Sequence, residues 1–195
     1  MANAADLRKP GFEVSPQFIN RWSPRSFLEK EIPEDVLLSL FEAARWAPSA
    51  SNVQPWRFII ARTQEDREKF HSFILPGNLV WCSKAPVLAV ILSQTATERG
   101  ANGWDAFDAG AAWGYLALEA HNKGLITHAM GGFDPGKARE VLNVPDDYAV
   151  QAVIAIGYQG EKEVLPDNLQ EREQPNGRRP LKESLFEGSF GKDAL

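Results

Sequence analysis

The stretch from Glu42 to Phe58, EAARWAPSASNVQPWRF, joins a helix pattern to a strand pattern through a polar loop. Apolar residues at helical spacing lie on its N-terminal side: Val36, Leu37, Leu40, Phe41 and Ala44. They predict a helix that begins at Pro33 and ends at Pro48. Residues 56–61 predict a strand. The Ser/Asn/Pro loop 48–55 can aim backbone N–H groups and amides at a polar ring edge, or it can be an ordinary helix-to-strand turn.

Outward from this stretch, the hydrophobic pattern predicts further helices and strands. Thr63 and Asp66 resemble a capping pair for a helix that runs to about Phe73. The continuous apolar run PVLAVILS at 86–93 predicts a buried strand. The other expected elements are strands at 126–130 and 150–158 and helices at 105–123 and 135–143, whereas residues 16–27 are expected to be irregular. This mixture indicates one three-layer domain, α+β or α/β, over residues 1–195.

Two segments suggest a second subunit. The helix expected at 105–123 is apolar on nearly all sides, so it should be buried, and in a chain of 195 residues that indicates a subunit interface as well as a core. The polar tail 160–195 is expected to be an arm that packs on the partner subunit. Its apolar anchors are Pro166, Leu169, Leu181, Leu185 and Phe186.

Composition excludes several classes of protein. The net charge of −5 argues against a nucleic-acid partner, and no apolar run approaches the ~20 residues that span a bilayer. The single cysteine, Cys82, cannot build a disulfide framework, which favours a reducing compartment. The three histidines form no metal-ligand pattern. We therefore expect a cytoplasmic protein with no metal and no membrane partner.

The segment RWSPRSF at 21–27 is the first candidate binding motif. Arg21, Ser23 and Arg25 point the same way if the segment is extended, because side-chain direction repeats every second residue. Such a segment can clamp a phosphate from two sides, or it can be a solvated basic turn.

Two glycine-containing segments are further candidates. Gly131 and Gly132 directly follow a predicted strand, where paired glycines let the backbone approach a flat ligand closely. The run from Gly131 to Lys137 is one residue short of a phosphate-binding P-loop, and Ala138 stands where that motif needs Ser or Thr, so nucleotide hydrolysis is disfavoured. The segment GRRPL at 177–181 is either a charged tail or an additional source of positive charge for a phosphate pocket.

The order and combination of these motifs, from about Arg21 to Leu181, resemble the nitroreductase family. The resemblance implies a mixed, largely antiparallel sheet flanked by helices, in an intertwined homodimer with FMN at the dimer interface. It implies that Arg21, Ser23 and Arg25 hold the FMN phosphate and ribityl chain with Arg178 or Arg179. It also implies that Gly131, Gly132 and Asn78 lie near the flavin ring, and that Pro48, Ser49 and Asn52 reach it from the other subunit.

The resemblance also implies the chemistry. NAD(P)H delivers hydride to flavin N5 and leaves, and a nitroaromatic, quinone or enone then takes the electrons, so no protein residue is assigned as a catalytic acid or base. The alternatives are a flavin-binding or redox-sensing protein without turnover, and the same fold with flavin-fragmenting or dehalogenating activity. This chain departs from many members at three positions: Ala50, Trp81 and Gly131 stand where Ser, Lys and Glu are found elsewhere.

Overall fold

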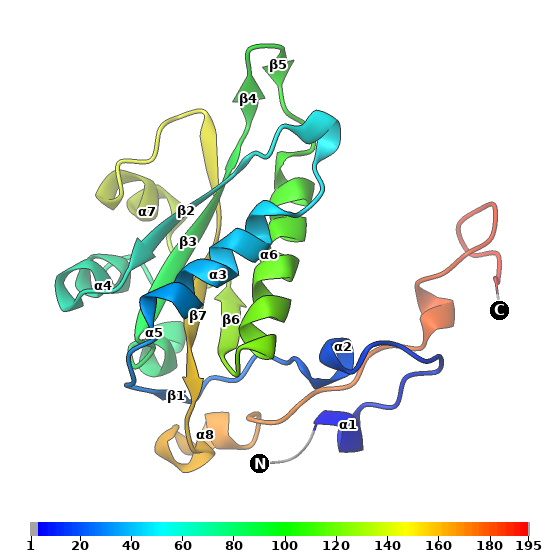
Figure 1. The fold of residues 1–195 in the computed structure, drawn as a ribbon, viewed down its shortest axis with the longest axis horizontal. Coiled ribbons are helices and arrows are strands. Elements are labelled where there is room, and N and C mark those ends of the chain that lie inside the picture. The colour runs from blue at the N-terminus through cyan, green and yellow to red at the C-terminus, as the bar shows by residue number, and fades with distance from the viewer. Residues whose placement is uncertain (1–3, 195) are drawn as a thin grey trace.

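The structure is a computed structural model that describes residues 4–194, and it contains a central sheet with helices on both faces (Figure 1). The helices are α1 (Ala4–Leu7), α2 (Pro16–Asn20), α3 (Glu34–Arg45), α4 (Gln64–His71), α5 (Pro76–Cys82), α6 (Asp105–Asn122), α7 (Pro135–Val141) and α8 (Asp167–Gln170), with 3-10 turns η1 (Ala50–Asn52), η2 (Lys162–Val164) and η3 (Leu181–Glu183). The strands are β1 (Phe27–Leu28), β2 (Trp56–Ala61), β3 (Val87–Gln94), β4 (Ala96–Thr97), β5 (Gly100–Ala101), β6 (Ile126–Met130) and β7 (Tyr148–Gln159).

The sheet is antiparallel in each of its pairings. Its path is β1-β7-β3-β2, and β6 also pairs with β7. The long strand β7 therefore holds β3 along one edge and β6 along the other. β4 and β5 form a separate two-stranded hairpin. The α+β class with a largely antiparallel sheet is thus confirmed.

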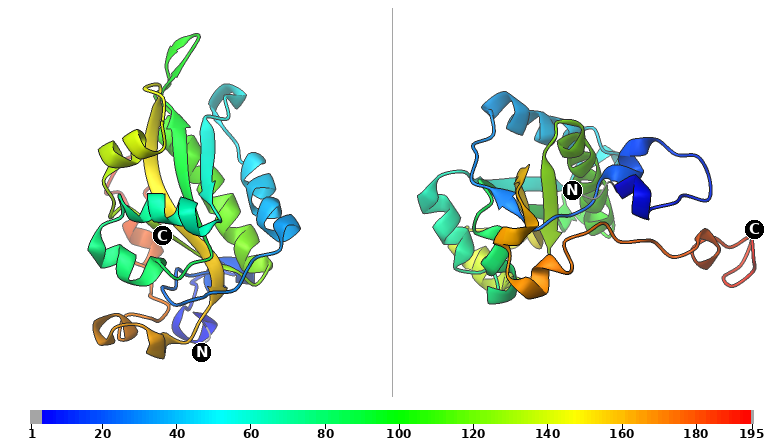
Figure 2. Two further views of the ribbon diagram at one scale, coloured as in Figure 1. Left: turned by 90° about the vertical axis from the view of Figure 1, so that its left-hand side faces the viewer. Right: turned by 90° about the horizontal axis from the view of Figure 1, so that it is seen from below.

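The two faces of the sheet pack against different helices, as Figure 2 (left) shows. Successive residues of a strand point to opposite faces, so β3 and β7 contribute to both cores. The core under α3 and α6 includes Leu37, Leu40, Leu116, Ile154 and Ile156. The core under α4, α5 and α7 includes Phe70, Trp81, Leu88, Val90 and Val153. This is the three-layer arrangement that the sequence predicts.

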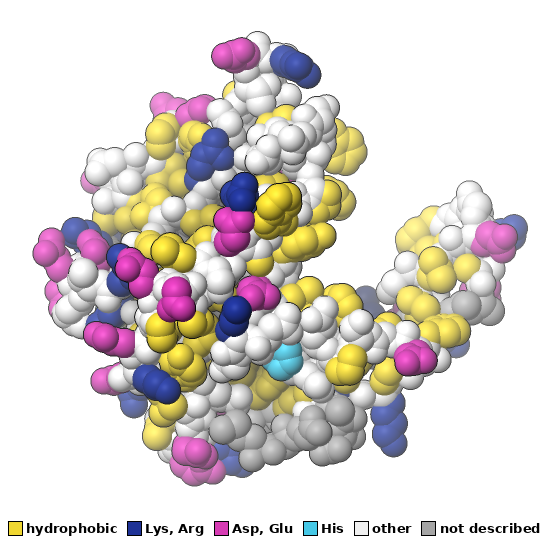
Figure 3. Space-filling model, viewed as in Figure 1, with side chains coloured by type: hydrophobic (Ala, Val, Ile, Leu, Met, Phe, Trp, Pro, Cys, Tyr) yellow, Lys and Arg dark blue, Asp and Glu magenta, His cyan; other side chains and the backbone are white. Residues whose placement is uncertain are grey.

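The predicted helix 105–123 forms α6, and Gly124 after it has the left-handed φ of +73° that a helix end favours. Only one side of α6 is buried, through Ala109, Ala112, Leu116 and Ala120. Phe107 on its other side is 75% exposed, and Figure 3 shows hydrophobic side chains gathered over this part of the body. The single chain thus covers one side of a helix that is apolar all round.

The tail differs from the expected arm in its first half. Leu165 and Leu169 are buried in the core of their own chain, because η2 and α8 fold back under the sheet. Only the last part, which includes η3, extends away from the body (Figure 2, right). The anchors Leu181 and Leu185 on that part remain exposed.

Several short elements lie where the sequence pattern predicts none. They include α2 and β1, which overlap the segment 16–27 that was expected to be irregular, the helices α1, α5 and α8, and the hairpin β4–β5. Pro76 begins α5, as proline does in first helical turns, but the apolar residues that follow it have no amphipathic period. Within residues 4–194, no helix has the length and apolar character that crossing a membrane requires.

Candidate functional site

A cleft lined by arginines lies between the segment 21–25 and the tail. It has a volume of about 470 Å³, and we call it the arginine cleft. Its cationic side chains are Arg8, Arg21, Arg25, Arg172 and Arg178. Ser23 also lines the cleft, and its Oγ accepts a hydrogen bond from Arg21 Nη1 at 3.3 Å. The residues Arg21, Ser23, Arg25 and Arg178 are therefore brought together, as the sequence predicts.

The positive charges in the arginine cleft are only partly compensated. Burial and the charge of Arg178 lower the pKa of Arg21 below its usual range. The pKa of Arg25 is also lowered, first by burial and then by the charge of Arg172, whereas the carboxylate of Glu173 raises it. Guanidinium groups that lower one another's pKa values repel, and an anion among them would relieve that repulsion. The cleft is thus chemically suited to a phosphate.

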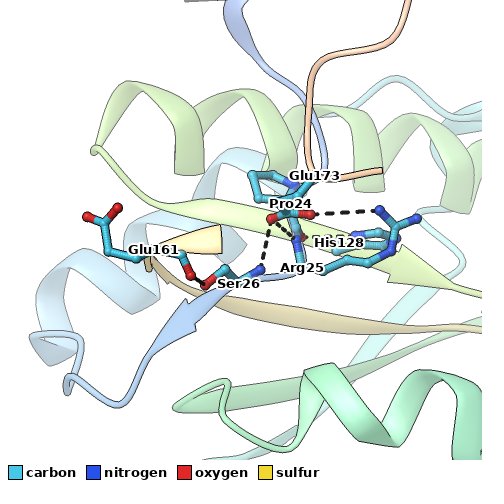
Figure 4. Close-up of polar contacts among 6 residues, drawn as sticks. All are labelled: Pro24, Arg25, Ser26, His128, Glu161 and Glu173. Atoms are coloured by element: carbon cyan, nitrogen blue, oxygen red, sulfur yellow. Dashed lines mark hydrogen bonds and ion pairs between the residues drawn. The ribbon is translucent and has the colours of Figure 1, made fainter. Parts of the chain in front are cut away.

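Glu173 fixes the backbone of the segment 21–26, as Figure 4 shows. Its Oε1 accepts hydrogen bonds from the backbone N–H groups of Arg25 at 2.7 Å and Ser26 at 2.9 Å, and its Oε2 lies 3.8 Å from Arg25 Nη1. Ser26 Oγ donates to the carbonyl of Glu161 at 2.6 Å. The side chain of Glu173 is only 2% exposed, so the tail forms one wall of the cleft in its own chain.

His128 of β6 lies at the floor of the arginine cleft. Its Nδ1 is 3.0 Å from the carbonyl oxygen of Pro24, which can only accept, so Nδ1 carries the proton. Burial is the largest cause that lowers the pKa of His128, and the Pro24 carbonyl opposes it. The ring of Trp81 lies 4.5 Å from the imidazole and is buried in the core. Trp81 therefore supports His128 from inside the core.

An apolar groove along α6 adjoins the arginine cleft. It has a volume of about 370 Å³ and shares Arg21 and Ser23 with the cleft. Its other walls are Trp113, Gly114, Ala117 and Leu118 of α6, Ala129 of β6, and Phe18. A cationic end joined to an apolar groove suits an elongated ligand with a phosphate at one end.

Gly131 and Gly132 follow β6 and differ in their surroundings. A Cβ on Gly132 would lie 2.3 Å from Asn78 Nδ2, whereas a Cβ on Gly131 would meet nothing within 4 Å. Asn78 Nδ2 donates to the Gly132 carbonyl at 3.2 Å, which places the amide of Asn78 beside this backbone. The residues Asn78 and Gly132 are thus in contact, and Gly131 is open to solvent.

The polar loop around η1 lies at the start of α6. Ser51, Asn52 and Gln54 have positive φ values of 49°, 55° and 51°, a backbone conformation that costs energy in non-glycine residues. The carboxylate of Asp108 accepts from the backbone N–H of Ala50 at 3.0 Å, and Ser49 Oγ accepts from the N–H of Gln54 at 3.0 Å. We call residues 48–54 the Ser-Asn loop. It does not line the arginine cleft of its own chain.

Some predicted residues lie elsewhere, and some lining residues are not predicted. Arg179 lines a neighbouring cleft between the N-terminal segment and the tail, whereas Arg178 lines both. The P-loop-like run is interrupted because Asp134 caps α7, accepting from the N–H of Lys137 at 3.0 Å. Arg8, Glu173 and His128 carry no local sequence signal, since each reaches the cleft only through the tertiary fold.

Comparison with known proteins identifies the family. The profile described as "Nitroreductase family" matches residues 19–80 and 76–158. The chain belongs to the nitroreductase family. Membership confirms the resemblance carried by the sequence motifs. The matched residues include Arg21, Asn78 and both glycines after β6, while the tail lies beyond them.

Individual relatives agree with this placement. A crystal structure described as that of an oxidoreductase containing FMN is 41% identical, has a TM-score of 0.92, and is matched over 99% of this chain and 100% of its own. An NADH dehydrogenase of Thermus thermophilus is 27% identical over 186 residues, which cover 78% of this chain and 90% of that protein. A crystal structure of an enone reductase, 24% identical with a TM-score of 0.69 over 75% of this chain and 88% of its own, shares the fold.

Proposed function

We propose that this protein binds FMN without a covalent link and uses NAD(P)H to reduce small acceptors such as nitroaromatics, quinones or enones. The observation that carries the proposal is that the arginine cleft and the apolar groove beside β6 share Arg21 and Ser23. The nitroreductase relatives support it, because one is described as an FMN-containing oxidoreductase and another as an NADH dehydrogenase. The single cysteine, Cys82, further favours a cytoplasmic location.

The residues present fit FMN on chemical grounds. Arg21, Arg25 and Arg178 offer guanidinium forks to a phosphate, which planar guanidinium groups bind in a bidentate manner. Gly132 has no room for a side chain beside Asn78, so its backbone and the Asn78 amide lie close together, and glycine there lets a flat ligand approach the backbone. The groove along α6 supplies apolar contact. No sequence motif for a second nucleotide half is present, which favours FMN over FAD.

The chain's contribution is to bind and orient. When bound, FMN supplies the redox chemistry, taking hydride from NAD(P)H and passing electrons to the acceptor in a ping-pong cycle. Burial raises the pKa of the Cys82 thiol to about 12, so Cys82 is not a nucleophile at neutral pH. The positive charge of the arginine cleft holds the phosphate and orients the flavin in the groove. No protein acid or base is assigned.

We further propose that the working unit is a homodimer. The exposed side of α6, with Phe107 and Tyr115, and the extended end of the tail, with Leu181, are apolar surfaces that a second copy would cover. The Ser-Asn loop has a strained backbone and lies outside the arginine cleft of its own chain. In a dimer it would serve the flavin of the other copy.

Flavin analysis tests the cofactor and the reaction. The purified protein should be yellow, should release FMN on denaturation, and should bleach anaerobically when NADH or NADPH is added. Steady-state NAD(P)H oxidation with a quinone separates an enzyme from a flavin-binding sensor. Release of FAD, or no flavin binding at all, would refute the cofactor. Bleaching without turnover would refute the enzyme.

Sedimentation tests the dimer. Holoprotein and apoprotein should both sediment as dimers, and dilution that separates the chains should release FMN. The expected interface is of the large obligate class, above roughly 2,000 Å² in total. A monomer that retains its FMN and its turnover would exclude a shared site.

A further inference from the structure

Arg8 lies outside residues 19–158, which the family profile matches, yet it lines the arginine cleft. It is 8% exposed although it belongs to the N-terminal segment. Its guanidinium reaches two other parts of the chain. Nη1 donates to the carbonyls of Ile19 at 2.9 Å and Arg21 at 2.7 Å, and Nε donates to the carbonyl of Asn176 at 2.8 Å. Nη2 donates to Asn176 Oδ1 at 3.2 Å.

The contacts of Asn176 connect Arg8 to Arg178. Asn176 Oδ1 also accepts from Arg178 Nη1 at 3.0 Å, so one side-chain oxygen holds two guanidinium groups. Arg8 thereby restrains Arg21 through its carbonyl and Arg178 through the shared Asn176. It connects the N-terminal segment, the segment 19–21 and the tail at the mouth of the cleft.

We propose that Arg8 is a positioning residue for phosphate binding, which sets Arg21 and Arg178 on opposite sides of the arginine cleft. This inference rests on the proposed binding of FMN. It adds to that function a latch formed by Arg8 and Asn176, two residues that lie 168 positions apart in the sequence. The latch closes the cleft within one chain, so it needs no contribution from a second copy.

The latch holds three positive side chains close together, which is favourable only when an anion lies among them. Burial is the largest cause that lowers the pKa of Arg8, and the charges of Arg178 and Arg21 lower it further. Among residues 4–194, none of these three arginines is within ion-pair distance of a carboxylate. Carbonyl oxygens alone satisfy Arg8. The fold therefore holds three like charges together, and a phosphate dianion would offset their repulsion.

The geometry requires arginine at this position. Four acceptor contacts in different directions match a planar guanidinium fork, whereas the lysine ammonium is a compact charge that cannot reach all of them at once. A role in positioning therefore differs from a role in charge alone. Arg8→Lys keeps the charge and loses the latch, and Arg8→Ala loses both.

The experiment compares FMN with riboflavin, which lacks the phosphate. Affinities of apoprotein for both are measured by flavin fluorescence for wild type, Arg8→Lys, Arg8→Ala and Lys9→Ala. Lys9 is the matched control, because it is an exposed neighbouring cation outside the arginine cleft. Both Arg8 variants should lose about tenfold or more in FMN affinity, the worth of a charge-assisted hydrogen bond. Riboflavin affinity should change little, and Lys9→Ala should match wild type.

Asn176→Ala tests the other end of the latch and covers the case in which an Arg8 variant fails to fold. It should reduce FMN affinity in the same selective way, and it should add little to the loss caused by Arg8→Lys, because both changes break one latch. Equal losses for FMN and riboflavin, full rescue by Arg8→Lys, or additive losses in the double variant would each overturn the proposal. A wild type that binds neither flavin would instead overturn the proposed function.

Discussion

The arginine cleft and the Ser-Asn loop are two candidate regions of this nitroreductase-family protein, and they are built in opposite ways. The cleft is assembled from distant segments of one chain, with Glu173 and Arg8 fixing its walls. The loop is a short local segment whose strained backbone faces solvent beside the first turn of α6. The cleft is thus formed within the single chain, whereas the loop lies outside that cleft.

The difference predicts which part of the proposed site depends on a second copy. A cleft held by hydrogen bonds within one chain should bind inorganic phosphate without a second copy, whereas retention of FMN should also need the loop of the second copy. A loop that stores strain persists only because surrounding contacts fix it, and such strain is characteristic of functional sites. We therefore expect changes in the cleft to affect cofactor binding, and changes in the loop to affect stability and turnover.

The largest expected effect is in the cleft. Arg21→Ala and Arg25→Ala each remove a charged donor worth about 1.5–3 kcal/mol, so FMN affinity should fall roughly ten- to a hundred-fold. Titration of apoprotein by flavin fluorescence measures this loss, and thermal unfolding should change much less. Arg179→Ala is the control, because Arg179 lines the neighbouring cleft. Unchanged affinity in both variants would mean that the segment 21–25 is a surface turn.

The next largest effect is expected from alanine substitution in the pair Gly131 and Gly132. Gly132→Ala forces the amide of Asn78 to move, since the new Cβ would lie 2.3 Å from Nδ2, and it breaks the hydrogen bond to the Gly132 carbonyl. Losing this hydrogen bond should lower the free energy of unfolding by about 1 kcal/mol, and displacing the Asn78 amide should weaken FMN binding relative to wild type. Gly131→Ala has free space and is the matched control. If both variants bind FMN equally well, Asn78 does not contribute to the site.

Local sequence patterns predicted most of the longer helices and strands. The features that they missed depend on contacts between segments that are distant in the sequence. An apolar segment closed by Gly124 was enough to locate α6. The inward fold of the tail depends on Leu165 and Leu169, whose burial requires a finished core. In the same way, Arg8 is part of the site through tertiary contacts with Ile19, Arg21 and Asn176, and no local motif records these contacts.

A smaller effect is expected in the Ser-Asn loop. Asp108→Ala removes the acceptor for the Ala50 N–H, so the free energy of unfolding should fall by about 1 kcal/mol at fixed protein concentration. Asp108→Asn keeps an oxygen acceptor and should retain most of the stability. Asp105→Asn is the control on the same turn, since Asp105 accepts from Ser93 Oγ and not from the loop. Equal losses in Asp108→Asn and Asp108→Ala would show that the charge matters and the loop contact does not.

The smallest effect is a pH dependence at the floor of the cleft. Burial lowers the pKa of His128, so the unfolded chain binds a proton more readily than the folded one between that lowered pKa and the ordinary value of 6.5. Stability from neutral His128 is therefore complete above pH 6.5 and declines as the pH falls below it. One proton limits the slope to about 1.4 kcal/mol per pH unit, and only part of this is expected. The variant His128→Gln removes this pH-dependent contribution, so its stability should decline less than that of wild type between pH 7 and pH 5.5.

Inorganic phosphate in the arginine cleft should reduce the wild-type decline in the same way, because an anion near His128 favours its protonated form. Denaturant unfolding at both pH values, with and without phosphate, measures the two effects. A decline as steep in His128→Gln as in wild type would assign the pH dependence to His71 and His121, whose pKa values burial also lowers.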